Sequence, residues 1–367
     1  MNKKVSCIIG TRPEVIKMAP VIRALKAAGH FEVSTLSSGQ HRELIAPLVD
    51  WFELDINADL SVMTENQSLS GLTARLMEGF DRYLSETRPD LVLAQGDTTT
   101  VFCAALACFY RHIPFGHVEA GLRTHNIHNP FPEEFNRVAV GRISQLHFCP
   151  TQLSRENIVS EYPPNGNSTY LTGNTVIDAL QYTVAKLKNH PTADMDHDIL
   201  LTAHRRESFG EPLAEIFSAV LELCQKFPDI KILYPVHPNP NVHAVAHRML
   251  GNQPNIKLSS PLDYPELVAA MQRAKVILTD SGGIQEEAPA LCKPVLVLRE
   301  TTERPEAVEI GVAKLIGAHR ESILTETCRL LTDTNHYQKM SQGGSPYGDG
   351  QAATRICTAV NEYLRIT

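Results

Sequence analysis

Short apolar runs alternate with longer amphipathic segments along the whole chain. Such runs, rich in β-branched residues, predict buried strands, and the segments between them have the spacing of helices. The predicted strands of the first half are Val5–Ile9, Glu32–Leu36, Leu91–Gln95 and Phe115–Val118. Those of the second half are Ile199–Ala203, Lys231–Tyr234, Val276–Thr279, Val295–Leu298 and Ala313–Ile316. Because strands that alternate with helices form parallel sheets, we expect an α/β fold with two doubly wound, Rossmann-like domains.

A polar segment separates the two halves. Residues 188–198 are mostly polar and contain Pro191, which indicates a hinge. We therefore expect an N-terminal Rossmann-like domain over residues 1–175, a C-terminal one over 176–350, and a C-terminal helix over 351–367 that packs back on the first domain. Ligands of such folds bind at the carboxyl ends of the strands, so two domains that face each other are expected to share a central cleft.

The composition excludes several classes of protein. A formal net charge of −7 and a single tryptophan argue against nucleic-acid binding, which needs a basic surface with aromatic side chains. No stretch approaches the roughly 18 uninterrupted apolar residues of a membrane span, and Arg12 and Lys17 interrupt the N-terminal apolar run. The eight cysteines have irregular spacing and no CxxC pair, which is typical of reduced, buried thiols. We expect a cytoplasmic protein that binds neither nucleic acid nor membrane.

The segment after the first strand predicts an anion site. Arg12 and Lys17 lie near the start of a predicted helix, where the helix dipole favours negative charge. The alternative is that Arg12 pairs with Glu14 and Lys17 is solvated. Only Gly10 is present where a dinucleotide fingerprint needs three glycines, so tightly bound NAD is disfavoured.

Acidic residues follow two further strands of the first half. Asp97 lies where a strand ends and a helix begins, which fits either a functional side chain or a helix cap. Glu119 and Glu133 invite an acid/base interpretation, since carboxylates in a partly desolvated cleft can transfer protons near neutrality. Glu133 and Glu134 can also simply favour the helix dipole, and that is the better interpretation of Glu134.

The second half offers a cationic group and a glycine turn. The segment His204–Glu207 brings an imidazole and two guanidinium groups to a strand end, where a diphosphate is a plausible target and a surface ion-pair network is the alternative. The turn Ser281–Gly283 exposes backbone N–H groups to phosphate oxygens, with Glu287 as a partner for ribose hydroxyls, unless the turn is only a capping box. Neither His243 with His247 nor His125 with His128 belongs to a metal-ligand set, so we expect no metal.

Seven motifs in the same order resemble the non-hydrolysing UDP-N-acetylglucosamine 2-epimerases over nearly the whole chain. They are Gly10–Glu14, Gly96–Thr100, Val118–Thr124, Pro132–Glu134, His204–Glu207, Asp280–Gly283 and Thr302–Glu306. The resemblance implies a GT-B type fold, a homodimer, and UDP-N-acetylglucosamine as substrate, with no metal or NAD as cofactor. By motif, the catalytic residues would be Asp97, Glu119, Glu133 and His204. The substrate-binding residues would be Arg12, Lys17, Arg137, Arg205, Ser281, Gly282, Gly283, Glu287 and Arg304. The segment Gln40–Glu43 matches one that binds an activating substrate molecule in some members, and the allosteric candidates are Gln40, His41 and Arg206.

The activity that the resemblance implies is inversion at carbon 2 to give UDP-N-acetylmannosamine for surface polysaccharides. Expulsion of UDP from carbon 1 acidifies the hydrogen at carbon 2, so we expect anti elimination to 2-acetamidoglucal and re-addition, with cations on the diphosphate and two proton-transfer groups. The alternatives are a hydrolysing 2-epimerase, a GT-B glycosyltransferase and a UDP-sugar-binding regulator. Isomerisation without an acceptor and without release of free sugar would distinguish a non-hydrolysing 2-epimerase from these three alternatives.

Overall fold

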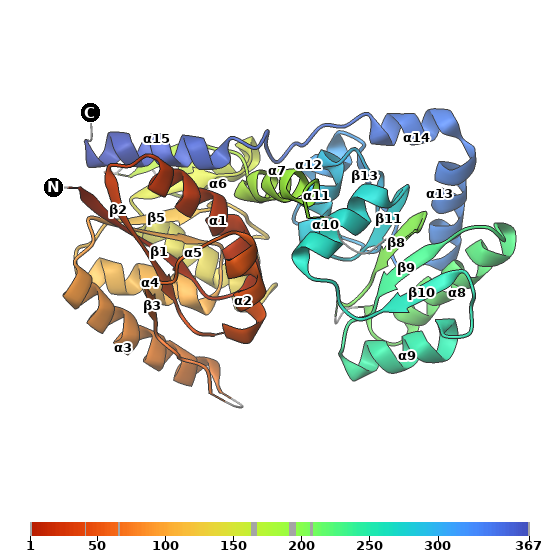
Figure 1. The fold of residues 1–367 in the computed structure, drawn as a ribbon, viewed down its shortest axis with the longest axis horizontal. Helices are drawn as coiled ribbons and strands as arrows, with labels where there is room; N and C mark the ends of the chain where they lie inside the picture. The colour runs from red at the N-terminus through yellow and green to blue at the C-terminus, as the bar shows by residue number, and fades with distance from the viewer. Residues whose placement is uncertain are drawn as a thin grey trace. The chain divides into compact units, whose positions relative to one another are not determined.

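A computed structural model of the chain describes residues 2–40, 42–64, 67–162, 167–190, 196–205 and 208–365. The chain forms two compact units (Figure 1). The first consists of Met1–Ala179 and Tyr347–Thr367, and the second of Leu180–Pro346. None of the helices in the described ranges is long and apolar enough to cross a bilayer.

The first unit is built on a seven-stranded sheet in which every pairing is parallel. Its strands are β1 (Lys3–Ile9), β2 (Phe31–Ser37), β3 (Ala58–Asp59), β4 (Leu91–Gln95), β5 (Phe115–Val118), β6 (Leu146–Cys149) and β7 (Ser168–Leu171). The strand order is β3-β2-β1-β4-β5-β6-β7, so the winding reverses between β1 and β4. In a doubly wound sheet this reversal opens a crevice at the carboxyl ends of the two strands.

Among the residues that the structure describes, eight helices accompany this sheet. They are α1 (Arg12–Ala27), α2 (Arg42–Trp51), α3 (Leu69–Thr87), α4 (Thr99–Tyr110), α5 (Glu133–Ile143), α6 (Gln152–Glu161), α7 (Thr175–Leu187) and α15 (Ala352–Leu364). The change from the first unit to the second falls within α7. The C-terminal helix α15 belongs to the first unit, where it contacts α1 and where Asp178 accepts hydrogen bonds from the N–H groups of Ala352 and Ala353 at 3.2 and 2.9 Å. That carboxylate therefore satisfies two N–H groups that a helix start leaves unpaired.

The second unit repeats the design with six parallel strands. They are β8 (Ile199–Thr202), β9 (Ile232–Pro235), β10 (Ile256–Ser259), β11 (Val276–Thr279), β12 (Val295–Val297) and β13 (Ala313–Leu315). Their order is β10-β9-β8-β11-β12-β13, so the winding reverses between β8 and β11. The helices are α8 (Glu211–Lys226), α9 (Pro240–Leu250), α10 (Tyr264–Arg273), α11 (Gly282–Ala290), α12 (Glu306–Glu309), α13 (Arg320–Thr332) and α14 (Thr334–Ser341).

Two parallel, doubly wound sheets confirm the predicted fold class. All nine predicted strands are present, with ends that differ by two residues or fewer, whereas β3, β6, β7 and β10 were not predicted. Most cysteines are buried free thiols, but Cys292 is exposed and Cys328 is half-buried, which corrects the expectation that all eight are buried. Apolar side chains of strands and helices form the core of each unit.

Candidate active site

The predicted site residues gather at the two points where the winding reverses. In the first unit, Arg12 follows β1 and Asp97 follows β4, and these two strands pair directly. In the second unit, His204 follows β8 and Ser281 follows β11, which are also neighbours. The carboxyl ends of both sheets therefore carry charged and polar groups where such folds bind ligands.

Glu119 is a buried carboxylate at the end of β5. Its side chain accepts hydrogen bonds from Lys17 Nζ at 2.5 Å, from Asn174 Nδ2 at 3.1 Å and from the amide of Gln95. The residue is only 8% exposed and has a φ of +64°, a left-handed conformation that residues other than glycine rarely adopt. Such strain persists only where surrounding groups hold it, and it is typical of functional sites. Lys17 is thus an ion-pair partner of Glu119 and not the solvated cation of the alternative interpretation.

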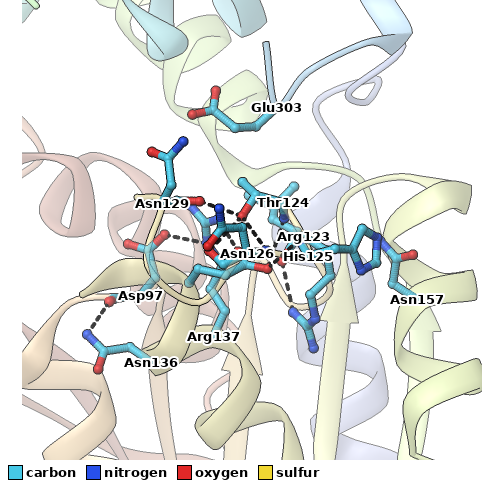
Figure 2. A network of polar contacts seen from close by, with 12 residues as sticks. Asp97, Arg123, Thr124, His125, Asn126, Asn129, Asn136, Arg137, Asn157 and Glu303 are labelled. Atoms are coloured by element: carbon cyan, nitrogen blue, oxygen red, sulfur yellow. Dashed lines mark hydrogen bonds and ion pairs between the residues drawn. The ribbon is translucent and has the colours of Figure 1, made fainter. Parts of the chain in front are cut away.

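Asp97 lies in the turn between β4 and α4. Its carboxylate accepts from Arg137 Nε at 2.8 Å, and its backbone oxygen accepts from Asn136 Nδ2 at 2.8 Å (Figure 2). The residue that caps α4 is Thr98, whose hydroxyl accepts from the N–H of Val101, so the interpretation of Asp97 as a helix cap was wrong. The Asp97 carboxylate is therefore held by a side chain of α5 and is not used by its own helix.

The two glutamates at the start of α5 have different environments. Glu133 is half-buried and makes no hydrogen bond or ion pair with the described residues. Glu134 is buried; one of its oxygens accepts from the N–H groups of Thr124 and His125 at 2.9 and 3.0 Å, and the other from Arg137 at 2.8 Å. Burial lowers the pKa of Arg137, but Asp97 and Glu134 outweigh it, so the pKa is raised and the guanidinium stays charged. The Glu134 carboxylate thus binds the backbone of residues 124 and 125 and Arg137, whereas Glu133 keeps a carboxylate available for a ligand.

Arg12 begins α1 without a carboxylate partner among the described residues. The alternative pairing with Glu14 was wrong, because Glu14 is buried and accepts from the N–H of Thr11 at 2.8 Å and from Thr98 Oγ1 at 2.6 Å. Burial raises the pKa of Glu14. The guanidinium of Arg12 at a helix N-terminus therefore remains suited to an anion.

In the second unit a buried aspartate accepts hydrogen bonds from the residues that follow β8. Asp280 is 0% exposed and accepts from the N–H groups of His204 and Arg205 at 2.7 and 2.8 Å, while His204 Nδ1 lies 3.0 Å from its other oxygen. Burial raises the pKa of Asp280, but the hydrogen bond and charge of His204 and the two N–H donors outweigh burial, so the pKa is lowered. Because Nδ1 faces this carboxylate, Nε2 of His204 is the nitrogen left for a ligand.

The glycine turn before α11 lies against an arginine. A Cβ atom on Gly282 would lie 2.8 Å from Nη1 of Arg304, so only glycine lets this guanidinium contact the start of the helix. Arg304 Nε donates to Glu286 at 2.6 Å, and Ser281 occupies the N-cap position without using its hydroxyl as a cap. Two glycine N–H groups, a free hydroxyl and a fixed cation are suited to phosphate oxygens.

The remaining predicted residues either contact other side chains or lie outside the described residues. Glu287 accepts a hydrogen bond from Tyr264 Oη at 2.6 Å, and Gln40 accepts one from Thr100 Oγ1 at 3.1 Å. His41 and Arg206 lie outside the described residues. Within the described ranges no group of three or more His, Cys, Asp or Glu side chains could hold a metal ion.

Sequence reasoning missed several residues that hold the site together. The missed residues are Gln95, Asn136, Asn174 and Asp280. Each is a hydrogen-bonding partner of a predicted residue. For Gln95, Asn174 and Asp280 a position at or just after a strand end was the available signal, whereas Asn136 lies within α5 and gave none. The site residues as a set remain a prediction, now with defined partners.

The two parallel, doubly wound sheets define a class of α/β protein with GT-B architecture. A solved glycotransferase of kitacinnamycin shares this fold, with a TM-score of 0.67 over 99% of this chain and all of that chain at 12% identity. That likeness confirms the predicted GT-B type fold and carries nothing about activity.

Comparison with known proteins identifies the family. The family model described as UDP-N-acetylglucosamine 2-epimerase matches residues 23–361. The UDP-N-acetylglucosamine 2-epimerase of Escherichia coli K12 is 47% identical over an alignment of 369 positions that covers 97% of this chain and 98% of that protein. A Neisseria meningitidis UDP-GlcNAc 2-epimerase, solved with UDP-GlcNAc bound, is 43% identical with a TM-score of 0.91 over 98% of this chain and all of that chain. The chain belongs to the UDP-N-acetylglucosamine 2-epimerase family, a family of isomerases, which confirms the resemblance.

Proposed function

We propose that the protein interconverts UDP-N-acetylglucosamine and UDP-N-acetylmannosamine without hydrolysis. The observation that carries the proposal is the division of chemistry between the two winding reversals. Acidic groups gather in the first unit, around Asp97 and Glu119, and phosphate-binding groups gather in the second, around His204 and Ser281. The substrate bound in the Neisseria meningitidis structure supports the same ligand.

The proposed reaction begins with cleavage of the bond between carbon 1 and the diphosphate oxygen. The bonding electrons leave with UDP, the anomeric carbon becomes electron-poor, and a carboxylate takes the proton from carbon 2, which gives 2-acetamidoglucal. Re-addition reverses these steps, with a proton delivered to the opposite face of carbon 2 and UDP returned to carbon 1. No atom or electron is gained or lost overall, so the reaction needs no redox partner.

The second unit is proposed to bind UDP and to stabilise it as a leaving group. The N–H groups of Gly282 and Gly283, with Arg205 and Arg304, would neutralise the diphosphate, and Glu287 would bind ribose hydroxyls. His204 would present Nε2 to a departing oxygen, since Asp280 orients the ring through Nδ1. Stabilising charge that develops only in the transition state is the effect that raises turnover.

The first unit is proposed to supply the proton-transfer groups for carbon 2. Glu119 is a candidate base because its carboxylate is buried and held by Lys17, Asn174 and Gln95. Glu133 and Asp97 are the candidates for the other face. Two carboxylates with different environments suit a reaction that removes a proton from one face and returns it to the other.

Two carboxamide variants test the roles of the carboxylates. Glu119→Gln and Glu133→Gln should each lower turnover at least about 100-fold, the usual contribution of a general acid or base, with little change in UDP affinity. Turnover is measured by the anomeric proton signals of both UDP-sugars in NMR, and UDP affinity by calorimetry. Glu86→Gln, on the exposed surface of α3, is the matched control and should behave as the wild type. Unchanged turnover in either site variant would remove that residue from the catalytic set.

The same NMR experiment tests the proposed function itself. Appearance of UDP-N-acetylmannosamine without an acceptor substrate supports it. Release of free N-acetylmannosamine with UDP would instead indicate the hydrolysing activity. Binding of the UDP-sugar without turnover would indicate a regulator. Homodimer formation, activation by a second UDP-sugar molecule near Gln40 and a role in surface polysaccharide or capsule synthesis remain proposals from the resemblance. A cytoplasmic location remains a proposal from the composition.

A further inference from the structure

A buried imidazole contacts the turn that carries Asp97. His117 lies on β5, two residues before Glu119, and is 1% exposed. Its Nε2 lies 2.7 Å from the backbone oxygen of Gly96. The N–H of Gly96 donates to the backbone oxygen of Val118 at 3.1 Å, so both backbone polar groups of Gly96 are bonded to β5.

The two hydrogen bonds hold Gly96 in a conformation that favours glycine. Gly96 has a φ of +91°, and a Cβ atom built on it would have no neighbour within 4 Å. Glycine has the most conformational freedom of any residue, so hydrogen bonds to both of its backbone polar groups help to keep it in one conformation. Asp97 follows directly, and the direction of its carboxylate depends on the backbone conformation of the turn.

We propose that His117 is a positioning residue for the proposed epimerisation. Its Nε2–H donates a hydrogen bond to the Gly96 carbonyl and thereby fixes the direction of the Asp97 side chain. A carbonyl oxygen can only accept, so this contact requires the tautomer with hydrogen on Nε2 and a bare Nδ1. The inference rests on the proposed function of Asp97.

The contact with Gly96 is the only hydrogen bond of the His117 imidazole among the described residues. Its Nδ1 is buried without a hydrogen-bond partner among the described residues. Burial lowers the pKa of His117 to about 4, so the ring is neutral near pH 7 and can keep one bare nitrogen. His147 is the neighbour of His117 in register on β6, is 0% exposed and stacks on Tyr162. Neither of its ring nitrogens makes a well-aligned hydrogen bond within the described part of the chain.

The neighbouring imidazole provides a matched control for three variants. His117→Leu removes the donor at similar volume, His117→Gln restores an N–H donor near the position of Nε2, and His147→Leu removes a buried imidazole with no bond to the turn. We expect His117→Leu to lower kcat on the order of 10- to 100-fold, because small displacements of a catalytic group have effects of this size. KM should change less than about threefold, since the turn is not proposed to bind UDP. His117→Gln should recover most of kcat, and His147→Leu should retain it.

A nuclear magnetic resonance measurement on the free protein separates this inference from the proposed function. With ¹⁵N-labelled histidine, the signals that vanish in His117→Leu should show hydrogen on Nε2 and a bare Nδ1. A wild-type protein without epimerase turnover would refute the proposed function while leaving this tautomer test intact. Hydrogen on Nδ1, a wild-type kcat in His117→Leu, or an equal loss in His147→Leu would overturn the inference.

Discussion

At the residue scale, Glu119 is the most constrained side chain of the candidate site. It combines a left-handed backbone with burial and with donors from α1, β4 and the segment before α7. A left-handed conformation outside glycine has a free-energy cost on the order of 1–3 kcal/mol, so the surrounding contacts must offset it. Lys17 is the only one of these three donors that carries a charge. We therefore regard the ion pair between Lys17 and Glu119 as the main contact that holds the carboxylate.

Removing one member of this ion pair should destabilise the first unit. Lys17→Met leaves a buried carboxylate without its cation, and the free energy of unfolding should fall by about 3 kcal/mol. Urea unfolding followed by the fluorescence of Trp51, the only tryptophan and a residue of α2, reports this unit. The double variant Lys17→Met with Glu119→Gln should recover much of the loss. Independent, additive effects of the two changes would show that the pair is not coupled.

The residue types of the site were predictable, but their partners were not. Charged side chains after strand ends identify Asp97, Glu119 and His204, because the strands themselves are visible as apolar runs. The contact between Lys17 and Glu119 joins positions 102 apart in sequence, and no local pattern reports it. The prediction that Asp97 caps α4 was wrong for a local reason, because the next residue, Thr98, occupies the N-cap position.

At the element scale, three strands with compact apolar runs were predicted with their observed bounds, whereas two mixed strands at sheet edges were missed. Leu91–Gln95, Phe115–Val118 and Val276–Thr279 have the predicted bounds, since their apolar runs end sharply. Strand β7 has the sequence Ser-Thr-Tyr-Leu and is an edge strand, and β10 alternates as Ile-Lys-Leu-Ser at the other sheet's edge. Edge strands need fewer apolar residues than central ones, so a search for apolar runs misses them.

The paired histidines of β5 and β6 should make the stability of the first unit depend on pH. Burial lowers the pKa of His117 to about 4 and of His147 to about 3. In the unfolded chain both titrate near pH 6.5, so below that pH the unfolded state binds protons that the folded state excludes. The stabilisation is therefore complete above about pH 6.5 and is lost as the pH falls towards 4.

His147→Leu isolates one of these two contributions without touching the candidate site. Between pH 7 and 5 the wild type should lose roughly 2 kcal/mol more of its unfolding free energy than the variant, at 1.36 kcal/mol for each pKa unit. Urea unfolding followed by Trp51 fluorescence at the two pH values makes the comparison. Identical losses in the two proteins would mean that His147 is not kept neutral by the fold.

At the scale of the whole molecule, each of two similar doubly wound sheets carries its own set of candidate residues. Each unit has one reversal of winding, and each reversal has its own set of side chains. The alternation of strands and helices predicted this repetition from sequence, whereas the family resemblance supplied the reaction. The proposed reaction needs both sets on one substrate, because loss of the proton from carbon 2 depends on departure of UDP.

The most direct test of that dependence is the exchange of the hydrogen at carbon 2 with solvent. Purified protein is incubated with UDP-N-acetylglucosamine in deuterated water, and carbon 2 of the product is examined by NMR. The proposed elimination and re-addition predict deuterium at carbon 2 of every UDP-N-acetylmannosamine molecule formed. Product that retains its original hydrogen at that carbon would contradict the account.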